Sequence, residues 1–301
     1  MSVYSAQQST DSQPPEAIWV AKSDNAKTLA TILQTIVFKP EDSKKKDSVN
    51  ITVEFNEEGM KFIVEHGKEY QASVFFQSSF FKTYNYDRNT RDFYRFKLNL
   101  SMLLDCLNIF GSYPGHDRLV PIQFFYWDTP TPFNMILEDS GVNTTCQFKI
   151  MDTESPEFFN LDDIQNNNVV ISSEHLLDAF GTLDFKSPEI RIKLGLNEGP
   201  DKDLLILSST SSESTFISTC KQKLFDFCDC KYDLEFNYAL SHIQPCVKAL
   251  ATAKSTRVTV GVNGLLRFQN TFVHDEKRLV VEYFITARQH DNYFTDHHMM
   301  G

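Results

Sequence analysis

The chain has 301 residues, which is long enough for two domains that each bury a core of their own. Hydrophobic residues make up 41 % of the chain and include 26 phenylalanines, so we expect a packed globular fold. The formal net charge of -11 argues against a protein that coats nucleic acid with its whole surface, because phosphate binding requires concentrated Lys and Arg. A local basic patch on an acidic body is still compatible with this charge.

The two ends of the chain carry no recognisable targeting signal. The first 16 residues are rich in Ser, Gln, Asp and Pro, which is typical of a disordered tail, and they lack the apolar core of a signal peptide. Residues 288–301 are expected to form a second tail. No run of about 18 apolar residues occurs, so we predict no transmembrane helix and no membrane partner. These features favour an intracellular protein.

The six cysteines are spread thinly along the chain. Cys228 and Cys230 form the one close pair, and it lacks the second pair or nearby His that a structural zinc site needs. We therefore expect reduced, mostly buried thiols, no metal site and no cofactor.

The ordered part begins with a strand and an amphipathic helix. Residues 17–22 alternate as a strand does, and Asp24 is the expected N-cap of a helix with an apolar stripe from Leu29 to Ile36. Three alternating runs follow, at residues 50–55, 60–65 and 70–77. The short turns between them favour antiparallel pairing, because parallel strands need long crossovers.

The most distinctive stretch spans residues 93–111, where a strand runs directly into a short helix. Phe96 and Leu98 alternate with polar residues, as in a half-buried strand. From Ser101, the expected N-cap, the apolar residues then take the spacing of a helix. The same change of period recurs at residues 232–253, which indicates a duplicated fold.

Both halves of the chain follow one order of elements. After three strands between residues 120 and 150, an acidic, Asn-rich stretch at residues 151–168 reads as an extended interdomain linker. Strand, helix, three strands, strand into helix and three strands then repeat. We therefore predict an α+β fold with two similar domains, residues 17–150 and 169–287, each an antiparallel sheet covered on one face by two helices.

These motifs resemble one family. The element order resembles that of the DNA clamps related to proliferating cell nuclear antigen. More narrowly, SMLLDCLNIFGS, GMKFIVEHGKEYQASVFFQ, QPCVKAL and LVVEYF resemble the Rad-one-type subunit of the heterotrimeric DNA damage checkpoint sliding clamp, the nine-one-one ring. LLDCLNIFG is specific for this subunit type, whereas VVEY is shared across clamps. The resemblance covers about residues 17–287.

The resemblance implies a non-catalytic subunit that acts in the nucleus. It implies a ring with two paralogous clamp subunits, which is loaded by a separate ATPase and encircles double-stranded DNA independently of sequence. Such a ring recruits checkpoint and repair proteins, which dock through short peptides. The chain has no Gly-rich phosphate loop that ends in Lys-Ser or Lys-Thr, so we expect no ATP hydrolysis of its own.

The resemblance also assigns three groups of candidate residues. The polar sides of the four helices would face DNA, with the candidates Lys22, Lys27, Lys186, Lys248 and Lys254. A partner-peptide pocket would lie between linker and sheet, lined by Tyr70, Phe158, Phe159, Leu161, Tyr283 and Ile285. The subunit interfaces would use two edge strands, with Val142, Thr144, Cys146, Phe148 and Ile150 on one and Thr215, Phe216, Ile217 and Cys220 on the other. Simpler alternatives are solvated lysines, aromatic residues that only staple the linker to the sheet, and edges guarded by local loops.

Two other functions stay open as alternatives. One is a homotrimeric replication sliding clamp. The other, of another class, is a metal-dependent 3'-5' exonuclease, which needs several carboxylates that converge on metal ions. The candidate carboxylates are Asp128, Glu138, Asp139, Asp162 and Asp163. They fall at turns and in the linker without a recognisable motif, so we favour a solvated acidic surface.

Overall fold

The computed structural model describes residues 17–38, 49–89, 91–110, 119–128, 131–195, 203–274 and 276–288. The expected N-terminal tail, residues 1–16, and residues 289–301 of the expected C-terminal tail lie outside the described residues.

The first half follows the predicted order, with one addition. Its elements are β1 (Trp19–Ser23), α1 (Ala26–Thr35), β2 (Asn50–Phe55), β3 (Gly59–His66), β4 (Tyr70–Gln77), β5 (Thr83–Tyr86), β6 (Tyr94–Asn99), α2 (Leu100–Leu107), β7 (Ile122–Tyr126), β8 (Phe133–Asp139) and β9 (Val142–Phe148). A single 3-10 turn, Ser78–Phe80, precedes β5. Neither the turn nor β5 was predicted from the sequence.

The second half repeats this order, and the addition with it. Its elements are β10 (Asn166–Ser172), α3 (Ser173–Gly181), β11 (Glu189–Leu194), β12 (Asp203–Thr210), β13 (Thr215–Lys221), β14 (Phe225–Asp229), β15 (Leu234–Ala239), α4 (Leu240–Leu250), β16 (Ser255–Gly261), β17 (Leu266–His274) and β18 (Lys277–Ile285). A 3-10 turn, Gln222–Leu224, precedes β14 as its counterpart precedes β5. The strand into helix junction is confirmed in both halves, at β6 to α2 and at β15 to α4.

Two helices begin at residues other than the predicted caps. Asn25, not Asp24, caps α1, and its side chain accepts a hydrogen bond from the Thr28 amide. Asn99, not Ser101, caps α2 by accepting from the Met102 amide. Asn is as good an N-cap as Asp or Ser, so residue preference alone did not decide between neighbouring positions.

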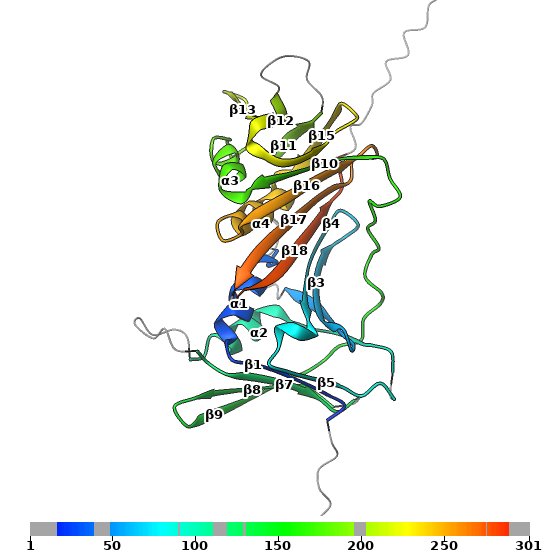
Figure 1. Ribbon diagram of the computed structural model, residues 1–301, viewed down its shortest axis with the longest axis vertical. Helices are drawn as coiled ribbons and strands as arrows, with labels where there is room; N and C mark the ends of the chain where they lie inside the picture. Colours follow the sequence, from blue (N-terminus) through cyan, green and yellow to red (C-terminus); the bar gives the residue numbers. More distant parts are fainter. Residues whose placement is uncertain are drawn as a thin grey trace, which may run out of the picture.

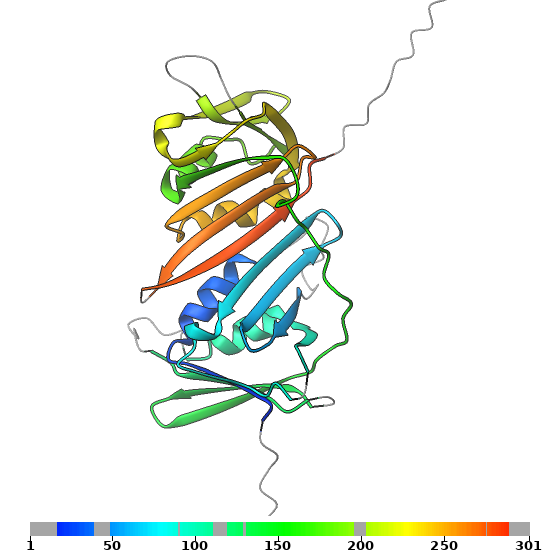
Figure 2. The same ribbon diagram turned by 45° about the vertical axis from the view of Figure 1, so that its right-hand side comes forward.

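The strands form three antiparallel sheets. Their orders are β5-β1-β7-β8-β9, β14-β10-β16-β17-β18-β4-β3-β2-β6 and β13-β12-β11-β15. Strand β18 of the second half pairs with β4 of the first, from Val281 opposite Val74 to Ile285 opposite Tyr70. The nine-stranded sheet therefore runs across both halves without a break (Figure 2).

The four helices lie on one side of this sheet, and the linker passes on the other side (Figure 1). Helix α1 packs on α2, α3 packs on α4, and α1 also touches α4 across the boundary between the halves. The sheet therefore separates a helical surface from an outer surface that carries the linker. No helix in the described part of the chain is long and apolar enough to cross a membrane.

The core is unusually aromatic. Trp19 of β1 is fully buried and stacks on Phe55 of β2 with ring centroids 4.4 Å apart. Phe124 and Phe133 stack on Trp19 in turn, at 6.3 and 5.9 Å. Burial of such rings is the main stabilising contribution in a fold of this kind.

Where the two halves meet, aromatic residues from both are buried together. Phe38, which follows α1, stacks on Tyr70 of β4 at 4.5 Å, and His242 of α4 lies 5.7 Å from Tyr70. The Tyr283 hydroxyl donates a 3.0 Å hydrogen bond to the Thr35 carbonyl oxygen. Contacts from the end of α1, from Phe38 and from α4 thus reinforce the backbone pairing of β4 with β18.

Asn167 of β10 joins the nine-stranded sheet to the four-stranded one. Its Nδ2 donates to the carbonyl oxygens of Leu194 and Tyr232, each at 2.7 Å. Its Oδ1 accepts from the amides of Lys231 and Tyr232 at 2.9 and 3.1 Å. The residue is fully buried, so no water can replace these four bonds.

We expect Asn167→Ala to destabilise the protein strongly, because it leaves several buried backbone groups without partners. The expected loss is at least about 3 kcal/mol of unfolding free energy, measured by urea denaturation. Asn160→Ala is the matched control, since Asn160 also makes side-chain hydrogen bonds, but on the exposed linker. A loss at Asn167 no larger than that at Asn160 would contradict this role.

We expect His242 to make stability depend on pH. Burial lowers its pKa below 6.5, against an opposing effect of Glu69, so the folded protein binds this proton less readily than the unfolded chain does. Stability should therefore be complete above about pH 6.5 and fall as the pH drops below it. The check is the thermal midpoint at about pH 7.5 and 5.5. The thermal midpoint of His242→Gln should fall less between these two pH values than that of the wild type. His175 is exposed, so the midpoint of His175→Gln should fall as much as that of the wild type.

Candidate functional site

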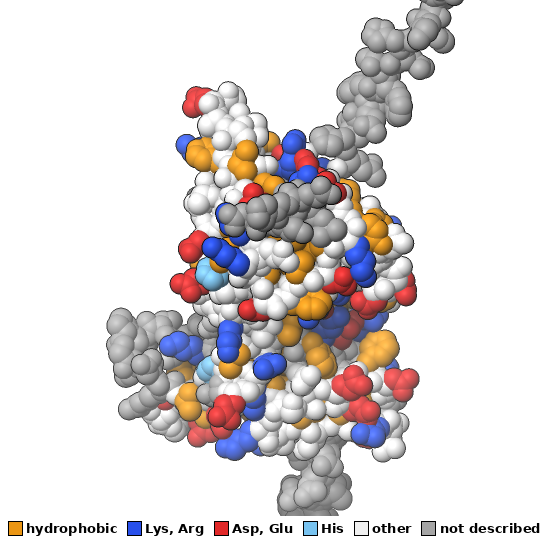
Figure 3. All heavy atoms as spheres, turned by 45° about the horizontal axis from the view of Figure 1, so that its top comes forward, with side chains coloured by type: hydrophobic (Ala, Val, Ile, Leu, Met, Phe, Trp, Pro, Cys, Tyr) orange, Lys and Arg blue, Asp and Glu red, His pale blue; other side chains and the backbone are white. Residues whose placement is uncertain are grey.

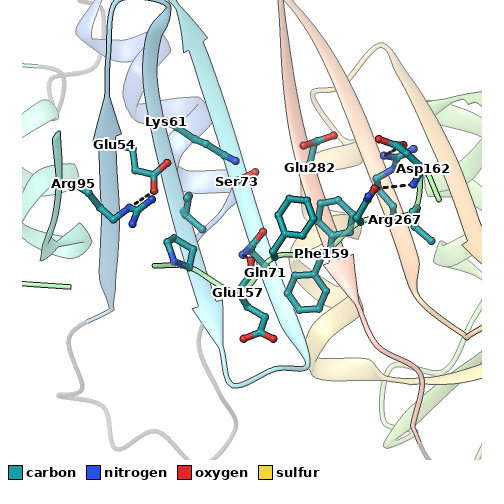
Figure 4. Close-up of a pocket in the computed structure, with 16 residues that line it drawn as sticks. Glu54, Lys61, Gln71, Ser73, Arg95, Glu157, Phe159, Asp162, Arg267 and Glu282 are labelled. Atoms are coloured by element: carbon teal, nitrogen blue, oxygen red, sulfur yellow. Dashed lines mark hydrogen bonds and ion pairs between the residues drawn. The ribbon is translucent and has the colours of Figure 1, made fainter. Parts of the chain in front are cut away.

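A hollow of about 390 Å³, here called the outer pocket, lies between the linker and the outer face of the nine-stranded sheet (Figure 4). Strands β2, β3, β4, β6, β17 and β18 contribute to it, and so do residues 156–162 of the linker. Its lining is mainly polar, with Glu54, Lys61, Gln71, Ser73, Arg95, Arg267 and Glu282. The pocket spans the pairing of β4 with β18 and therefore draws residues from both halves.

Two side chains attach the linker to the second half. Phe159 stacks on Phe284 of β18, with ring centroids 5.7 Å apart and planes 12° apart. Leu161 is only 1 % exposed and packs with Leu265 and Phe284 in a small cluster separate from the main core. Phe158 points elsewhere and is 84 % exposed. All three residues line the outer pocket.

Hydrogen bonds attach the linker to the first half. The Glu65 carboxylate accepts from the Glu157 amide at 2.7 Å, and Gln71 Nε2 donates to the Glu157 carbonyl oxygen at 2.8 Å. Arg95 Nη1 donates to Ser155 Oγ at 2.9 Å. The linker backbone is therefore fixed at Glu157 by two side chains of one β-hairpin.

The other three residues predicted for this pocket do not line it. Tyr70, Tyr283 and Ile285 are each fully buried and point to the helix side of the sheet. Burial raises the pKa of both tyrosines well above the usual value. Strand side chains alternate between faces, so a shift of one residue exchanges the buried set for the outward set.

The residues that replace them in the pocket are the strand neighbours Gln71, Glu282 and Phe284. They were not predicted, because the residues that the resemblance assigned to the pocket lie one position away along each strand, on the face that is buried. The signal that could have found the polar ones is alternation, since Gln71 and Ser73 alternate with apolar residues in β4, and Glu282 interrupts the apolar run of β18.

Most charges in the outer pocket are already engaged. Arg95 forms an ion pair and a hydrogen bond with Glu54, and both side chains are largely buried. Glu282 accepts a 2.6 Å hydrogen bond from Gln269. Arg267 lies 3.8 Å from Asp162 of the linker. The pocket thus presents ordered polar groups on a rigid sheet.

Two strands at opposite ends of the molecule are free sheet edges. Among the described residues, β9 pairs only with β8, and β13 pairs only with β12 (Figure 1). Exposed apolar side chains lie on both, with Val142 at 56 %, Phe216 at 43 % and Ile217 at 64 % exposure. Edges of this kind offer unpaired backbone groups to another chain.

Not every candidate interface residue points outward. Thr215 is exposed, and Thr144 and Cys146 are half-buried. Phe148 is buried against Phe133, and Ile150 lies beyond the end of β9. Cys220 is 2 % exposed, and burial raises the pKa of its thiol to about 11. Phe148 and Cys220 can therefore contribute to an interface only through their backbone.

All six cysteines are free thiols in the structure, but only Cys220 and Cys246 are fully buried, so the expectation of mostly buried thiols is wrong. Burial also raises the pKa of Cys106 and of Cys230 to about 12. These thiols stay protonated near neutral pH, which makes them poor nucleophiles and poor metal ligands.

The five candidate lysines are all exposed. Lys27 lies on α1, Lys248 on α4, Lys186 after α3 and Lys254 before β16. Lys22 lies on β1 and alternates with the buried Trp19 and Ala21, so its side chain points away from the face that packs in the core. Figure 3 shows basic side chains interspersed with acidic ones on the face in view.

The five candidate carboxylates come from separate parts of the fold. Glu138 and Asp139 end β8, Asp128 follows β7, and Asp162 and Asp163 lie on the linker. Within the described ranges, no group of three or more His, Cys, Asp or Glu side chains could hold a metal ion.

Sequence comparison identifies relatives along most of the chain. The family described as Repair protein Rad1/Rec1/Rad17 matches residues 18–272. The Cell cycle checkpoint protein RAD1 of Homo sapiens is 29 % identical over 271 residues, which cover 88 % of this chain and 90 % of that protein. The DNA repair protein Rad1 of Drosophila melanogaster is 24 % identical over 285 residues, which cover 92 % of this chain and 97 % of that protein.

Two solved structures of proliferating cell nuclear antigens have the same fold. The Proliferating Cellular Nuclear Antigen of Entamoeba histolytica has a TM-score of 0.67 at 13 % identity, and the match covers 91 % of this chain and all of that one. The PCNA2-PCNA3 complex of Sulfolobus tokodaii gives 0.66 at 14 % identity, covering 89 % and 99 %. The predicted α+β clamp fold is confirmed. With a family match that spans most of its length, this chain belongs to the Rad1/Rec1/Rad17 family of repair proteins.

Proposed function

We propose that this chain is a non-catalytic subunit of a heterotrimeric checkpoint clamp. With two paralogous subunits it encircles double-stranded DNA at damage sites in the nucleus, is loaded by a separate ATPase, and recruits checkpoint and repair proteins through short peptides. We assign residues 17–150 and 166–287 to its two clamp domains and residues 151–165 to the linker that connects them, because β10 begins at Asn166 and not at the predicted residue 169. The names of the relatives as checkpoint and repair proteins favour this function over a replication clamp.

One observation supports assembly into a ring. In element order, β9 of the first half corresponds to β18 of the second, and β13 corresponds to β4. Inside the chain, β18 pairs with β4, whereas the equivalent strands β9 and β13 are sheet edges within the described residues. Pairing β9 with a β13-like edge of the next subunit repeats a contact that the chain already makes. A head-to-tail contact repeated in this way closes into a ring when the rotation fits.

The DNA-facing role follows from the position of the helices. If the sheets are joined edge to edge, all four helices lie on the same side of the joined sheet (Figure 1). Lys27 and Lys248 then face the enclosed space from α1 and α4. Asp105, Glu174 and Asp178 are exposed on the other two helices, so the partners must provide much of the positive field. Contacts to phosphate alone hold DNA without reading its sequence.

The non-catalytic assignment rests on the distribution of the carboxylates. Two-metal hydrolysis needs carboxylates that converge on ions about 4 Å apart. The candidates here end β8, follow β7 or lie on the linker. Metal-dependent degradation of DNA by the pure chain, lost on replacement of one of these carboxylates, would overturn the assignment.

We expect Phe216→Asp to abolish ring assembly, because it places a charge among the apolar side chains of the β13 edge. The measurement is the mass of the complex with two candidate clamp paralogues. Phe227→Asp is the matched control, since Phe227 is 46 % exposed on a strand outside the two proposed interfaces. The chain alone should run as a monomer of 34.7 kDa. A trimer of this chain alone would favour the homotrimeric clamp instead.

We expect Lys27→Glu combined with Lys248→Glu to weaken retention of the assembled ring on DNA. The dependence of the logarithm of the binding constant on the logarithm of salt concentration should become shallower by about 0.9 for each phosphate that the ring no longer neutralises. Arg257→Glu with Arg278→Glu is the control, because these exposed residues alternate with buried ones that face the helices. An equal effect of both pairs would contradict a DNA-facing helical surface.

A further inference from the structure

The outer pocket is partly filled by the chain itself. Phe159 covers Phe284, and Leu161 is buried between Leu265 and Phe284. Leu161 also packs directly on the β16 backbone, since a Cβ added at Gly261 would lie 2.8 Å from Leu161 Cδ2. The apolar part of the pocket is therefore occupied before any partner arrives.

Arg267 is a basic residue of the pocket whose donors are only partly used. Its side chain is only 16 % exposed and lies against Phe284, with Cζ 6.0 Å from the ring centroid. Its Nε is buried and has no hydrogen-bond partner among the described residues. An arginine held in place in this way loses little freedom when it binds a carboxylate, which favours a bidentate contact.

The carboxylate that now faces Arg267 makes a weak contact. Arg267 Nη1 and Asp162 Oδ1 are 3.8 Å apart, which is beyond hydrogen-bond distance, and the Asp162 side chain is 81 % exposed. Exposed ion pairs of this length contribute little to stability. A carboxylate with better geometry can therefore replace Asp162 at small cost.

The linker is in effect a peptide bound to its own protein. It places an aromatic ring on Phe284, an apolar side chain two residues later, and a carboxylate near Arg267 three residues later. Side chains hold its backbone upstream at Glu157 and downstream, where Asn166 Nδ2 donates to the carbonyl oxygens of Leu161 and Ile164. Residues 158–162 can leave the pocket when the bond from Asn166 to Leu161 opens, while the attachments at Glu157 and Ile164 stay in place.

We propose that residues 158–162 are a built-in ligand of the outer pocket. Partner peptides that dock there carry an aromatic residue followed three positions later by Asp or Glu, and they displace Phe159 from Phe284 and Asp162 from Arg267. The inference rests on the proposed function, in which the outer pocket receives partner peptides. It adds the chemistry of the peptide and the competitor that it meets.

An acidic peptide fits the pocket better than a basic one, because the acidic side chains of the pocket floor already have partners. The acidic residues on the pocket floor have partners, Glu54 with Arg95 and Glu282 with Gln269. Arg267 retains unused donors, and Lys61 adds a second positive group on the same sheet face (Figure 4). A carboxylate gains charge-assisted hydrogen bonds here, whereas a cation would have to break existing ones.

The test uses the linker sequence as a separate peptide. A fluorescein-labelled peptide of residues 153–164 is added to the full chain, and its dissociation constant is measured by fluorescence anisotropy. The release variant combines Phe159→Ser with Leu161→Ser, both outside the main core. We expect this variant to bind the peptide at least about tenfold more tightly than wild type, a difference of about 1.4 kcal/mol.

Two further changes test the role of Arg267. Adding Arg267→Gln to the release variant should weaken binding about tenfold. Asp162→Asn alone, which vacates Arg267 without disturbing an apolar contact, should strengthen binding, whereas Asp163→Asn should not. Asp163 is the matched control because it accepts a hydrogen bond from Asn160 and does not contact Arg267.

Three results would overturn the inference. They are no binding of the peptide to the release variant, binding that is insensitive to Arg267→Gln, and equal binding of a peptide with Asn in place of its Asp162. Ring assembly is measured on the same samples and should not change, because β9 and β13 lie away from the pocket. Failure of the wild-type chain to assemble, together with the expected peptide binding, would contradict the ring and leave the built-in ligand supported.

Discussion

The architecture depends on one contact, the antiparallel pairing of β18 with β4. It joins two repeats that each have their own helices and turns them into one nine-stranded sheet. Tyr70 and Tyr283 lie on the helix side of this pairing and are fully buried there with Phe38 and His242. Because a sheet has two faces, the same pairing defines both surfaces to which we assign a function.

On one face, the pairing aligns the helices of both halves; on the other, it forms the floor of the outer pocket. The linker has to cross this outer face to connect the halves, and hydrogen bonds at Glu157 and packing at Leu161 hold it there. The same linker residues therefore connect the two halves and occupy the outer pocket. The segment that makes the chain continuous also covers the site at which we propose that partners dock.

The sequence predicted the repeat because periodicity survives in long elements. Strands with several buried side chains and the strand into helix junctions carry enough alternation to be recognised in both halves. The short strands β5 and β14 have no buried side chain, so no core-facing residues mark them, and both were missed. The caps were misplaced by one or two residues because Asp24, Asn25, Asn99 and Ser101 are all good cap residues.

The candidate pocket was harder to predict than the fold. Linker residues Phe158, Phe159 and Leu161 were found because apolar residues are conspicuous in an acidic stretch. The strand residues were assigned to the wrong face. The strands at the pocket have helices on one side and the linker on the other, and sequence alone does not tell which side faces the linker. Tyr70 is buried and Gln71 lines the pocket, whereas the resemblance had assigned Tyr70 to it. Arg267 and Glu54 were not considered, because their roles depend on contacts between distant strands.

The central claim is that the edges β9 and β13 repeat, between subunits, the contact that β18 and β4 make within the chain. Amide hydrogen exchange tests it most directly, because unpaired edge amides exchange fast and paired ones slowly. We expect amides of β9 and β13 to exchange more slowly when the two paralogous subunits are added, while the exchange rates of amides at the β14 edge do not change. Assembly of the complex without added protection in β9 and β13 would contradict it.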